Sequence, residues 1–311
     1  MDSILITAIG KRVQLIKHLK QNFRIVGIDA SILNPAKNFT DIFYQVPKYT
    51  QENYVEELMK ICLKENVKMI IPLFEKEFLT LLKFKDEFEN KGIKLLLSDK
   101  KVIEICNGKF YTYEFFKNWG IKTPKSYIIE ELAGLQEFPL IIKPEDGMGS
   151  EGVYKVHNEK ELLFFYKCVN NPIIQEFIQG TEYTVDVLCD FNGKVISVVP
   201  RERLEIRAGE VSKSRTVKNE NIIKKTVELI EKLNKEGVVI GPITVQCIVN
   251  ETGIYFIEIN PRFGGGVPLS FEAGVDYGKY LSQMLERKEV KSIIGEFKEI
   301  TMLRYDEAVF I

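Results

Sequence analysis

The chain has 311 residues, of which 43 are basic and 44 acidic, so its formal net charge is −1 at pH 7. This balance excludes binding to nucleic acid or to a membrane through bulk charge, and no apolar run is long enough to span a bilayer. The length and the 45% hydrophobic content predict two or three structural units. The five cysteines show no metal-ligand spacing and the N-terminus shows no signal-peptide pattern, so we expect a reduced, cytoplasmic protein.

The first hundred residues alternate short apolar runs with amphipathic segments. The pattern predicts strands near residues 4–8, 23–29, 69–73 and 94–97, and helices near residues 13–22, 54–66 and 78–91. Such alternation with short connections is typical of a parallel sheet with helices on both faces. We therefore predict a Rossmann-like domain over residues 1–106.

The turn after the first predicted strand carries one glycine, Gly10, and lacks the Gly-x-Gly-x-x-Gly pattern of dinucleotide-binding domains. Asp29 ends the second strand, where an acid that binds a ribose would lie in such a domain. Dinucleotide binding stays open, but a single glycine is weak support for it. A structural role, or a share in the site of an acceptor substrate, fits the turn better.

The later elements mix helices and strands. A helix near residues 109–119 precedes strands near 126–129, 138–144 and 153–156, and a helix near 159–169 follows. Strands then dominate near 173–177, 183–190 and 195–200, before a helix near 222–235, a hairpin over 246–262 and a helix near 267–285. The predicted fold class is α/β and α+β, with two further units over residues 107–180 and 181–311.

The predicted hairpin carries an amide, a carboxylate, a second amide and an arginine: Gln246, Glu258, Asn260 and Arg262. Glu258 and Asn260 are two residues apart in a strand, so both side chains leave the same face. Oxygen-bearing side chains suit Mg²⁺, and an arginine beside them suits a phosphoryl group. The alternative is a set of polar residues that merely ends a buried strand.

The register of this hairpin adds a structural requirement. If Val249 pairs with Ile254, then Gln246 lies opposite Ile257 and faces away from Glu258. The two side chains converge only if the hairpin contains a bulge or a different loop length. We therefore predict an irregularity between Gln246 and Glu258.

Two weaker motifs precede the hairpin. Lys143 ends an apolar strand and is followed by a loop with three glycines in six residues, which lets backbone N–H groups approach phosphate oxygens. The loop lacks the Walker pattern and is also explained as a glycine-rich hairpin turn. Further on, the strand 175–178 enters a short connection with Glu182 beyond it, so its backbone can pair with an adenine edge and the carboxylate with a ribose. An ordinary strand–turn–strand with solvated acids is the alternative.

These motifs follow one another in an order that resembles the ATP-grasp superfamily. The order is Lys109, Lys143, the glycine loop, the segment 175–178 with Glu182, and then Gln246, Glu258, Asn260 and Arg262. The run Ile-Glu-Ile-Asn-Pro-Arg-Phe-Gly-Gly-Gly over residues 257–266 is similar to the carbamoyl-phosphate-synthase large-subunit branch. The resemblance covers essentially the whole chain and implies a two-subdomain ATP-grasp fold after the N-terminal domain.

The resemblance also implies roles for the motif residues. The residues implied to bind ATP are Lys109, Lys143, Gly147, Gly149, Ser150, Gln175, Glu176, Phe177, Ile178 and Glu182. Those implied to hold Mg²⁺, with two ions expected and Mn²⁺ as a substitute, are Gln246, Glu258 and Asn260. Asn107-Gly108 precedes Lys109 where the family commonly has an Asp-Lys pair. The chain also lacks the second ATP-grasp copy of a carbamoyl phosphate synthetase, so that synthesis is not expected.

We expect an ATP-dependent carboxylate–amine ligase that phosphorylates a small-molecule carboxylate and lets an amine displace the phosphate. Glu258 and Arg262 are the expected catalytic residues, and no enzyme nucleophile is needed. This agrees with the presence of only two histidines, neither near a nucleophile motif. Two alternatives stay open: a small-molecule kinase without amine ligation, and a non-catalytic ATP-binding regulator.

The expected partners are a small-molecule carboxylate and an amine, with no nucleic acid and no membrane, and a homodimer is a plausible assembly. The residues expected at the substrate are Arg201, Arg203, Arg215, Gly265 and Gly266. Gly265 and Gly266 precede a predicted helix whose N-terminus suits an anion. The arginines are equally explained as solvated charges at strand ends.

Overall fold

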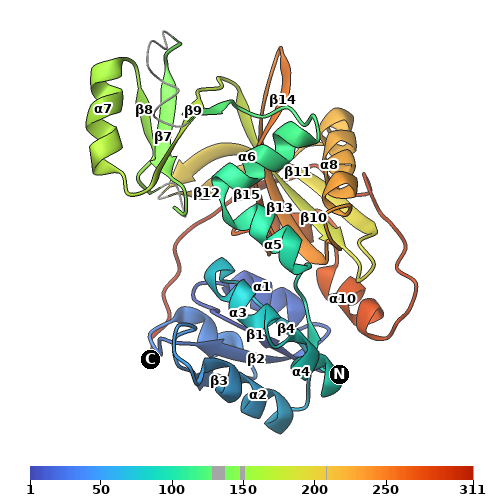
Figure 1. The fold of residues 1–311 in the computed structure, drawn as a ribbon. Helices are drawn as coiled ribbons and strands as arrows, with labels where there is room; N and C mark the ends of the chain where they lie inside the picture. The colour runs from blue at the N-terminus through green and yellow to red at the C-terminus, as the bar shows by residue number, and fades with distance from the viewer. Residues whose placement is uncertain (128–136, 148–150, 208, 311) are drawn as a thin grey trace.

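The computed structural model describes residues 1–127, 137–147, 151–207 and 209–310, and these residues build three sheets (Figure 1). The N-terminal sheet is parallel, with the strand order β3-β2-β1-β4-β5. Its strands are β1 (Ser3–Ile6), β2 (Arg24–Asp29), β3 (Ile42–Gln45), β4 (Val67–Ile71) and β5 (Lys94–Leu95). Its helices are α1 (Val13–Leu19), η1 (Pro35–Phe39), α2 (Tyr54–Lys64), η2 (Glu75–Glu77), α3 (Phe78–Leu82) and α4 (Lys85–Asn90). The predicted Rossmann-like parallel sheet is confirmed.

Both faces of the N-terminal sheet are covered, because consecutive residues of β1 enter different cores. Ile4 and Ile6 pack in one core with residues of α1, whereas Leu5 packs in the other with residues of α2. Side chains of a strand point alternately to opposite faces, so an unbroken apolar run is typical of a strand buried on both sides. The first core continues into the large sheet, where it includes Val185 and Val245.

The small sheet is antiparallel and has its own core. Its strands, in the order β6-β9-β7-β8, are β6 (Ser126–Tyr127), β9 (Pro172–Glu176), β7 (Leu140–Pro144) and β8 (Tyr154–Val156). Helix α7 (Glu159–Cys168) packs on it, and Leu140, Ile142 and Leu162 lie in the shared core. This core is separate from the two that surround the N-terminal sheet.

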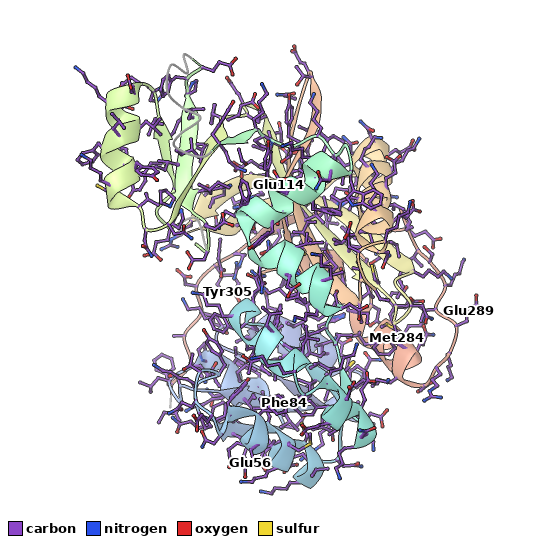
Figure 2. All side chains as sticks on the ribbon, viewed as in Figure 1. Glu56, Phe84, Glu114, Met284, Glu289 and Tyr305 are labelled. Atoms are coloured by element: carbon purple, nitrogen blue, oxygen red, sulfur yellow. The ribbon has the colours of Figure 1, made fainter. Side chains whose placement is uncertain are left out.

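The large sheet is also antiparallel, with the order β14-β13-β10-β11-β12-β15. Its strands are β10 (Thr181–Cys189), β11 (Val195–Arg207), β12 (Glu210–Thr216), β13 (Gly241–Asn250), β14 (Gly253–Asn260) and β15 (Thr301–Leu303). Helix α8 (Glu220–Leu233) packs on β11, and helices α5 (Lys100–Asn107) and α6 (Lys109–Asn118) pack on β14. After β15 the chain runs past Tyr305 toward the N-terminal sheet (Figure 2).

Several predicted elements differ from the observed ones. The helix predicted over residues 78–91 is broken between α3 and α4, and the helix predicted over 267–285 is broken into α9 (Pro268–Glu272) and α10 (Tyr277–Leu285). Gly274 between α9 and α10 has φ +113°, a conformation that ends a helix. Strands β3, β12 and β15 and helix α5 were not predicted, and β11 extends further than expected.

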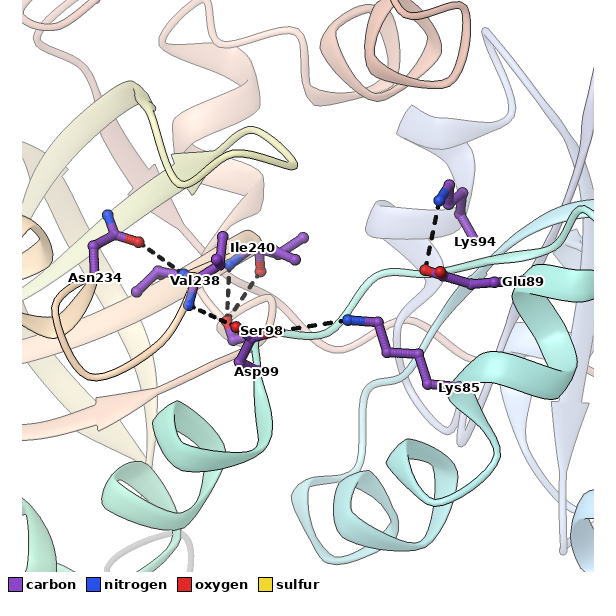
Figure 3. Close-up of polar contacts among 9 residues, drawn as sticks. Lys85, Glu89, Lys94, Ser98, Asp99, Asn234, Val238 and Ile240 are labelled. Atoms are coloured by element: carbon purple, nitrogen blue, oxygen red, sulfur yellow. Dashed lines mark hydrogen bonds and ion pairs between the residues drawn. The ribbon is translucent and has the colours of Figure 1, made fainter.

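The connection from β5 to α5 is tied to the loop that follows α8 (Figure 3). Ser98 Oγ accepts a hydrogen bond from the Ile240 N–H at 2.9 Å and donates to the Ile240 carbonyl at 3.3 Å. Asp99 donates its backbone N–H to Val238 O at 3.0 Å and accepts the Val238 N–H on Oδ2 at 2.9 Å. Ser98 is fully buried, so these four bonds attach the N-terminal sheet firmly to the large sheet.

Among the described residues, no helix combines the length and the apolar character needed to cross a bilayer.

Candidate functional site

The hairpin of β13 and β14 contains the predicted irregularity. Val249 pairs with Ile254, as simple register requires, whereas Gln246 pairs with Glu258. The register shifts between these two pairs, and Ile257 is the extra residue of a β-bulge. The bulge turns Gln246 to the same side as Glu258, so the prediction is confirmed.

Three polar side chains of the hairpin meet on that side. Gln246 Nε2 and Asn260 Nδ2 both donate to Glu258 Oε1, at 2.8 and 2.6 Å. Arg203 Nη1 donates to Gln246 Oε1 at 3.2 Å, and Arg203 Nε lies 3.5 Å from Glu182 Oε2. A continuous chain of contacts therefore joins β14 to β13, β11 and β10.

This polar group lines a cavity of about 700 Å³ that involves all three sheets. That volume is within the range of pockets that hold a small ligand. The predicted residues that line it are Lys109, Lys143, Gly147, Gln175, Glu176, Phe177, Ile178, Glu182, Arg201, Arg203, Gln246, Glu258, Asn260, Arg262, Gly265 and Gly266. The predicted positions Gly149 and Ser150 lie outside the described residues.

Lys109 holds the start of the glycine loop. Its Nζ donates to the carbonyl oxygens of Glu145 and Gly147, both at 2.9 Å. Glu145 Oε1 in turn accepts the Phe110 N–H at 2.8 Å, at the first turn of α6. A Cβ at Gly108 would lie 3.0 Å from the same oxygen. The unexpected Asn107-Gly108 sequence is thus compatible with an anchored Lys109, because glycine leaves room for Glu145.

Lys143 is a buried cation at the end of β7. Only 7% of the residue is exposed. Burial lowers the pKa of Lys143 to about 8, and the negative charge of Glu258 opposes this shift. Among the described residues, no side chain forms a hydrogen bond or salt bridge with its ammonium. A buried cation of this kind is unfavourable for folding, so it requires a functional explanation.

The segment from Gln175 to Glu182 joins the small sheet to the large sheet. Gln175 is buried, and its Nε2 donates to Ser126 Oγ at 2.8 Å. The ring of Phe177 lies under Lys155 Nζ, 3.6 Å from the ring centroid. At Gly180 a Cβ would lie 2.5 Å from the Val249 carbonyl oxygen, so only glycine permits this close approach of β13.

Arg201 and Arg215, both expected at the substrate, lie on opposite faces of the sheet. Arg201 is 1% exposed and forms two hydrogen bonds with Asp186, from Nε at 2.7 Å and from Nη2 at 2.9 Å. Arg215 pairs across the strands with Glu202, at 2.7 Å, and its side chain is 54% exposed. Arg201 and Glu202 are neighbours in β11, so their side chains point to opposite faces of the sheet. Arg215 lies on the face of Glu202 and therefore points away from the cavity. The structure therefore separates Arg215 from the other predicted residues.

We expect the loss of these two ion pairs to change the free energy of unfolding by very different amounts. Arg201→Ala would leave the Asp186 carboxylate buried and unpaired, so we expect a loss of about 3–5 kcal/mol in the free energy of unfolding. Arg215→Ala removes an exposed pair and should lower it by about 1 kcal/mol at most. Urea unfolding of the two variants measures both values, and similar losses would contradict the contrast.

Two charged residues that follow strands of the N-terminal sheet line the cavity without having been named as site residues, although a share in an acceptor site was left open for the turn that carries one of them, Arg12. Glu75, which follows β4, lies with Oε1 2.8 Å from Arg262 Nε. Burial raises the pKa of Glu75, and the guanidinium of Arg262 opposes that shift. Arg12, which follows β1, also lines the cavity. Both residues lie beyond the carboxyl ends of parallel strands, where ligands bind in open α/β sheets, and this rule could have identified them.

Asp29 has a structural role in the turn that carries Arg12. Its Oδ2 accepts the Gly10 N–H at 3.0 Å and its Oδ1 accepts the Ser31 N–H at 2.9 Å. The carboxylate is thereby occupied by backbone donors, and the turn is fixed in place. For Asp29, these contacts favour a structural role over the ribose binding of a dinucleotide site.

Family models match two parts of the chain. The model of the ATP-grasp domain matches residues 106–266, more than half of the chain. The model of the PylC-like, N-terminal domain matches residues 4–96. Among curated proteins, the carbamoyl phosphate synthase large chain of Pyrococcus furiosus is 28% identical over 301 residues, which cover 90% of this chain and 28% of the relative. That of Clostridium perfringens is 25% identical and covers 94% of this chain and 29% of the relative, so the chain spans less than a third of their length.

Solved structures share the fold at low sequence identity. N5-carboxyaminoimidazole synthetase from Staphylococcus aureus, complexed with ADP, has a TM-score of 0.77 and 18% identity, with 94% of this chain and 79% of that chain covered. The biotin carboxylase domain of Hydrogenobacter thermophilus 2-oxoglutarate carboxylase, complexed with MgADP, ADP and bicarbonate, has a TM-score of 0.74 and 20% identity, with 96% and 72% covered. L-amino acid ligase from Bacillus licheniformis has a TM-score of 0.70 and 19% identity, with 92% and 74% covered.

Proposed function

This chain belongs to the ATP-grasp family, as the order of its motifs predicts, and we propose that it joins a small-molecule carboxylate to an amine at the expense of ATP. In the proposed reaction, a carboxylate oxygen attacks the γ-phosphorus of ATP, which forms an acyl phosphate and releases ADP. The amine nitrogen then attacks the acyl carbon, loses a proton and expels phosphate. The family comprises ADP-forming ligases and carboxylases, and L-amino acid ligase is among the structural neighbours.

One observation carries the proposal: the bulge at Ile257 brings Gln246 to the side of the hairpin that Glu258 and Asn260 share, in the same cavity as the buried Lys143. A phosphate chain supplies the negative charge that Lys143 lacks. In the proposed complex, Lys143 and Lys109 contact the phosphates together with the glycine loop. The residues proposed around the adenine and ribose are Gln175, Glu176, Phe177, Ile178 and Glu182.

The donor set of the hairpin fits Mg²⁺. Gln246, Glu258 and Asn260 offer one carboxylate and two amide groups, which is the oxygen chemistry that Mg²⁺ prefers. With a single carboxylate the protein supplies little charge, so phosphate oxygens would complete the coordination. When bound, Mg²⁺ would neutralise charge on the phosphates during transfer. Two ions, with Mn²⁺ as a substitute, belong to the same proposal.

The cavity suits a reaction without an enzyme nucleophile. Among the described residues that line it there is no histidine or serine. Cys106 lines it, but burial raises the pKa of its thiol well above the usual range, so the thiolate is not available. Positioning and charge stabilisation are then the main contributions, with Arg262 proposed at the transferred phosphoryl group. Arg201, Arg203, Gly265 and Gly266 are proposed at the acid substrate.

We also propose that residues 1–106, 107–180 and 181–311 form three units and that the protein assembles as a homodimer. The biotin carboxylase domain of Hydrogenobacter thermophilus 2-oxoglutarate carboxylase shares this fold and is a dimer in its solved structure, which supports the proposed homodimer.

The function is tested by ADP release from ATP and Mg²⁺ in the presence of a library of small carboxylic acids, with and without a library of amines. We expect turnover that requires both an acid and an amine, and an amide product in mass spectra. Transfer of phosphate that is independent of every amine would instead identify a small-molecule kinase. ATP binding without turnover across the whole library would favour a regulator.

A further inference from the structure

The cavity wall around Gly265 and Gly266 contains a buried nitrogen with no partner. Arg201 is 1% exposed, and Nε and Nη2 are used on Asp186. Its remaining nitrogen, Nη1, is buried without a hydrogen-bond partner among the described residues. A Cβ at Gly266 would lie 2.2 Å from Nη1, so the nitrogen lies directly against the backbone of this glycine. A buried donor without a partner is unfavourable, and a ligand oxygen would satisfy it.

A second unpaired cation reaches the same loop from the N-terminal sheet. Arg12 lines the cavity, and its Nη1 would lie 3.3 Å from a Cβ at Gly265. No described residue forms a hydrogen bond or salt bridge with its guanidinium. Each of the two adjacent glycines thus has a guanidinium close to it, Arg12 from the loop after β1 at Gly265 and Arg201 from β11 at Gly266.

The acidic residues near Arg12 are already paired with other arginines. Glu75 lies 2.8 Å from Arg262, and Glu210 lies 2.8 Å from Arg304. Three arginines therefore face two carboxylates, which leaves one positive charge in excess. Burial and the neighbouring charge of Arg262 lower the pKa of Arg12 to about 10, and the carboxylates of Glu210 and Glu75 oppose this shift only in part.

We propose that Arg12 and Arg201, which lie against Gly265 and Gly266, form a subsite for a second anionic group of the acid substrate. The substrate is then a dicarboxylate or a carboxylate that also carries a phosphate. Its reacting carboxylate lies toward Arg262, and its second anion binds at the side of the cavity that Arg12 closes. Guanidinium groups bind both carboxylates and phosphates through paired N–H donors, so one subsite suits either group. This inference rests on the proposed ligase function, because it concerns the acid substrate of that reaction.

The subsite can be tested by binding alone. The protein is saturated with Mg²⁺ and a non-hydrolysable ATP analogue, which fills the phosphate sites, and is then titrated calorimetrically with pairs of acids of equal chain length. Each pair consists of a straight-chain monocarboxylate and the corresponding α,ω-dicarboxylate or ω-phosphono acid, from three to six carbons. We expect at least one dianion to bind about tenfold or more tightly than its monocarboxylate.

Two variants assign the effect to Arg12. Arg12→Ala should abolish the preference for the dianion, and Arg12→Lys should restore part of it, since the charge returns without the planar donor pair. Lys11→Ala is the matched control, because Lys11 is an exposed cation on the same turn and should keep the wild-type preference. No preference in any pair, or equal losses in Arg12→Ala and Lys11→Ala, would overturn the subsite. The answer does not depend on turnover: failure of amine ligation alone would refute the proposed function and leave the binding result standing.

Discussion

Glu258→Gln is expected to lower ATP-dependent ADP release by about a thousandfold and to leave the fold intact. Glu258 is the single carboxylate among the three proposed metal-binding side chains, so its charge is the main attraction that the hairpin offers to Mg²⁺. Glutamine keeps the shape and an oxygen that accepts the two amide N–H groups of Gln246 and Asn260. The thermal unfolding temperature should therefore change little while the rate of turnover falls.

Two quantities are measured for the variant and for the wild type: kcat, and the concentration of Mg²⁺ that gives the half-maximal rate. Both use the acid and amine that the substrate search identifies. Glu251→Gln is the matched control, because Glu251 is exposed in the turn of the same hairpin and loses the same charge. That control should retain wild-type kinetics. If Glu258→Gln kept more than about a third of the wild-type kcat with an unchanged Mg²⁺ requirement, the metal role of the hairpin would be wrong.

Lys143→Met is expected to stabilise the protein and to disable it. The pKa of Lys143 is about 8 in the folded chain, against 10.5 for the ordinary side chain. Between these two values the unfolded chain binds the proton more strongly, so native stability rises with pH through that window. Below pH 8 Lys143 is charged in both states, and the whole cost of burying its charge applies. The difference between the two pKa values corresponds to about 3 kcal/mol of destabilisation. Methionine has a similar length and no charge, so the free energy of unfolding at pH 7 should rise by up to that amount.

The same substitution removes a cation proposed to contact the phosphates of ATP. A charge-assisted hydrogen bond to a phosphate is worth about 1.5–3 kcal/mol, so nucleotide affinity should fall by about 10- to 100-fold. Urea unfolding at pH 7 and at pH 10 measures the stability, and titration with a fluorescent ATP analogue measures the affinity. The gain in stability should shrink at pH 10. Lys167→Met, an exposed lysine in α7, is the control and should change neither quantity by much. A Lys143→Met protein that is less stable than wild type, or that binds nucleotide normally, would contradict this account.

The hairpin was predictable because its signals are local. Two residues of one strand share a face whatever the rest of the chain does, and pairing Val249 with Ile254 fixes which side Gln246 takes. The sequence alone therefore required a bulge or a different loop length in this hairpin. The N-terminal parallel sheet was predictable for the same reason, since unbroken apolar runs such as that of β1 are typical of strands buried on both faces.

The residues missed at the site depend on how distant parts of the chain pack. Arg12 and Glu75 reach the cavity only because the N-terminal sheet presents the carboxyl ends of β1 and β4 to the loop that carries Arg262. Arg201 and Arg215 looked equivalent in the sequence, but the pairing of Glu202 with Arg215 places Arg215 on the other face. Strand β3 is a short, half-buried edge strand whose pattern carries little signal.

The four hydrogen bonds of Ser98 and Asp99 have a consequence for how a nucleotide enters. They join the N-terminal sheet to the large sheet, and the two sheets also share one hydrophobic core, so they form a single rigid base. The small sheet has a core of its own and meets this base across the cavity. An outward movement of the small sheet therefore exposes less apolar surface than a separation of the N-terminal sheet from the large sheet would. Entry of ATP and departure of ADP should then follow the motion of the small sheet, while Arg12, Arg201 and Arg262 keep their mutual positions throughout the cycle.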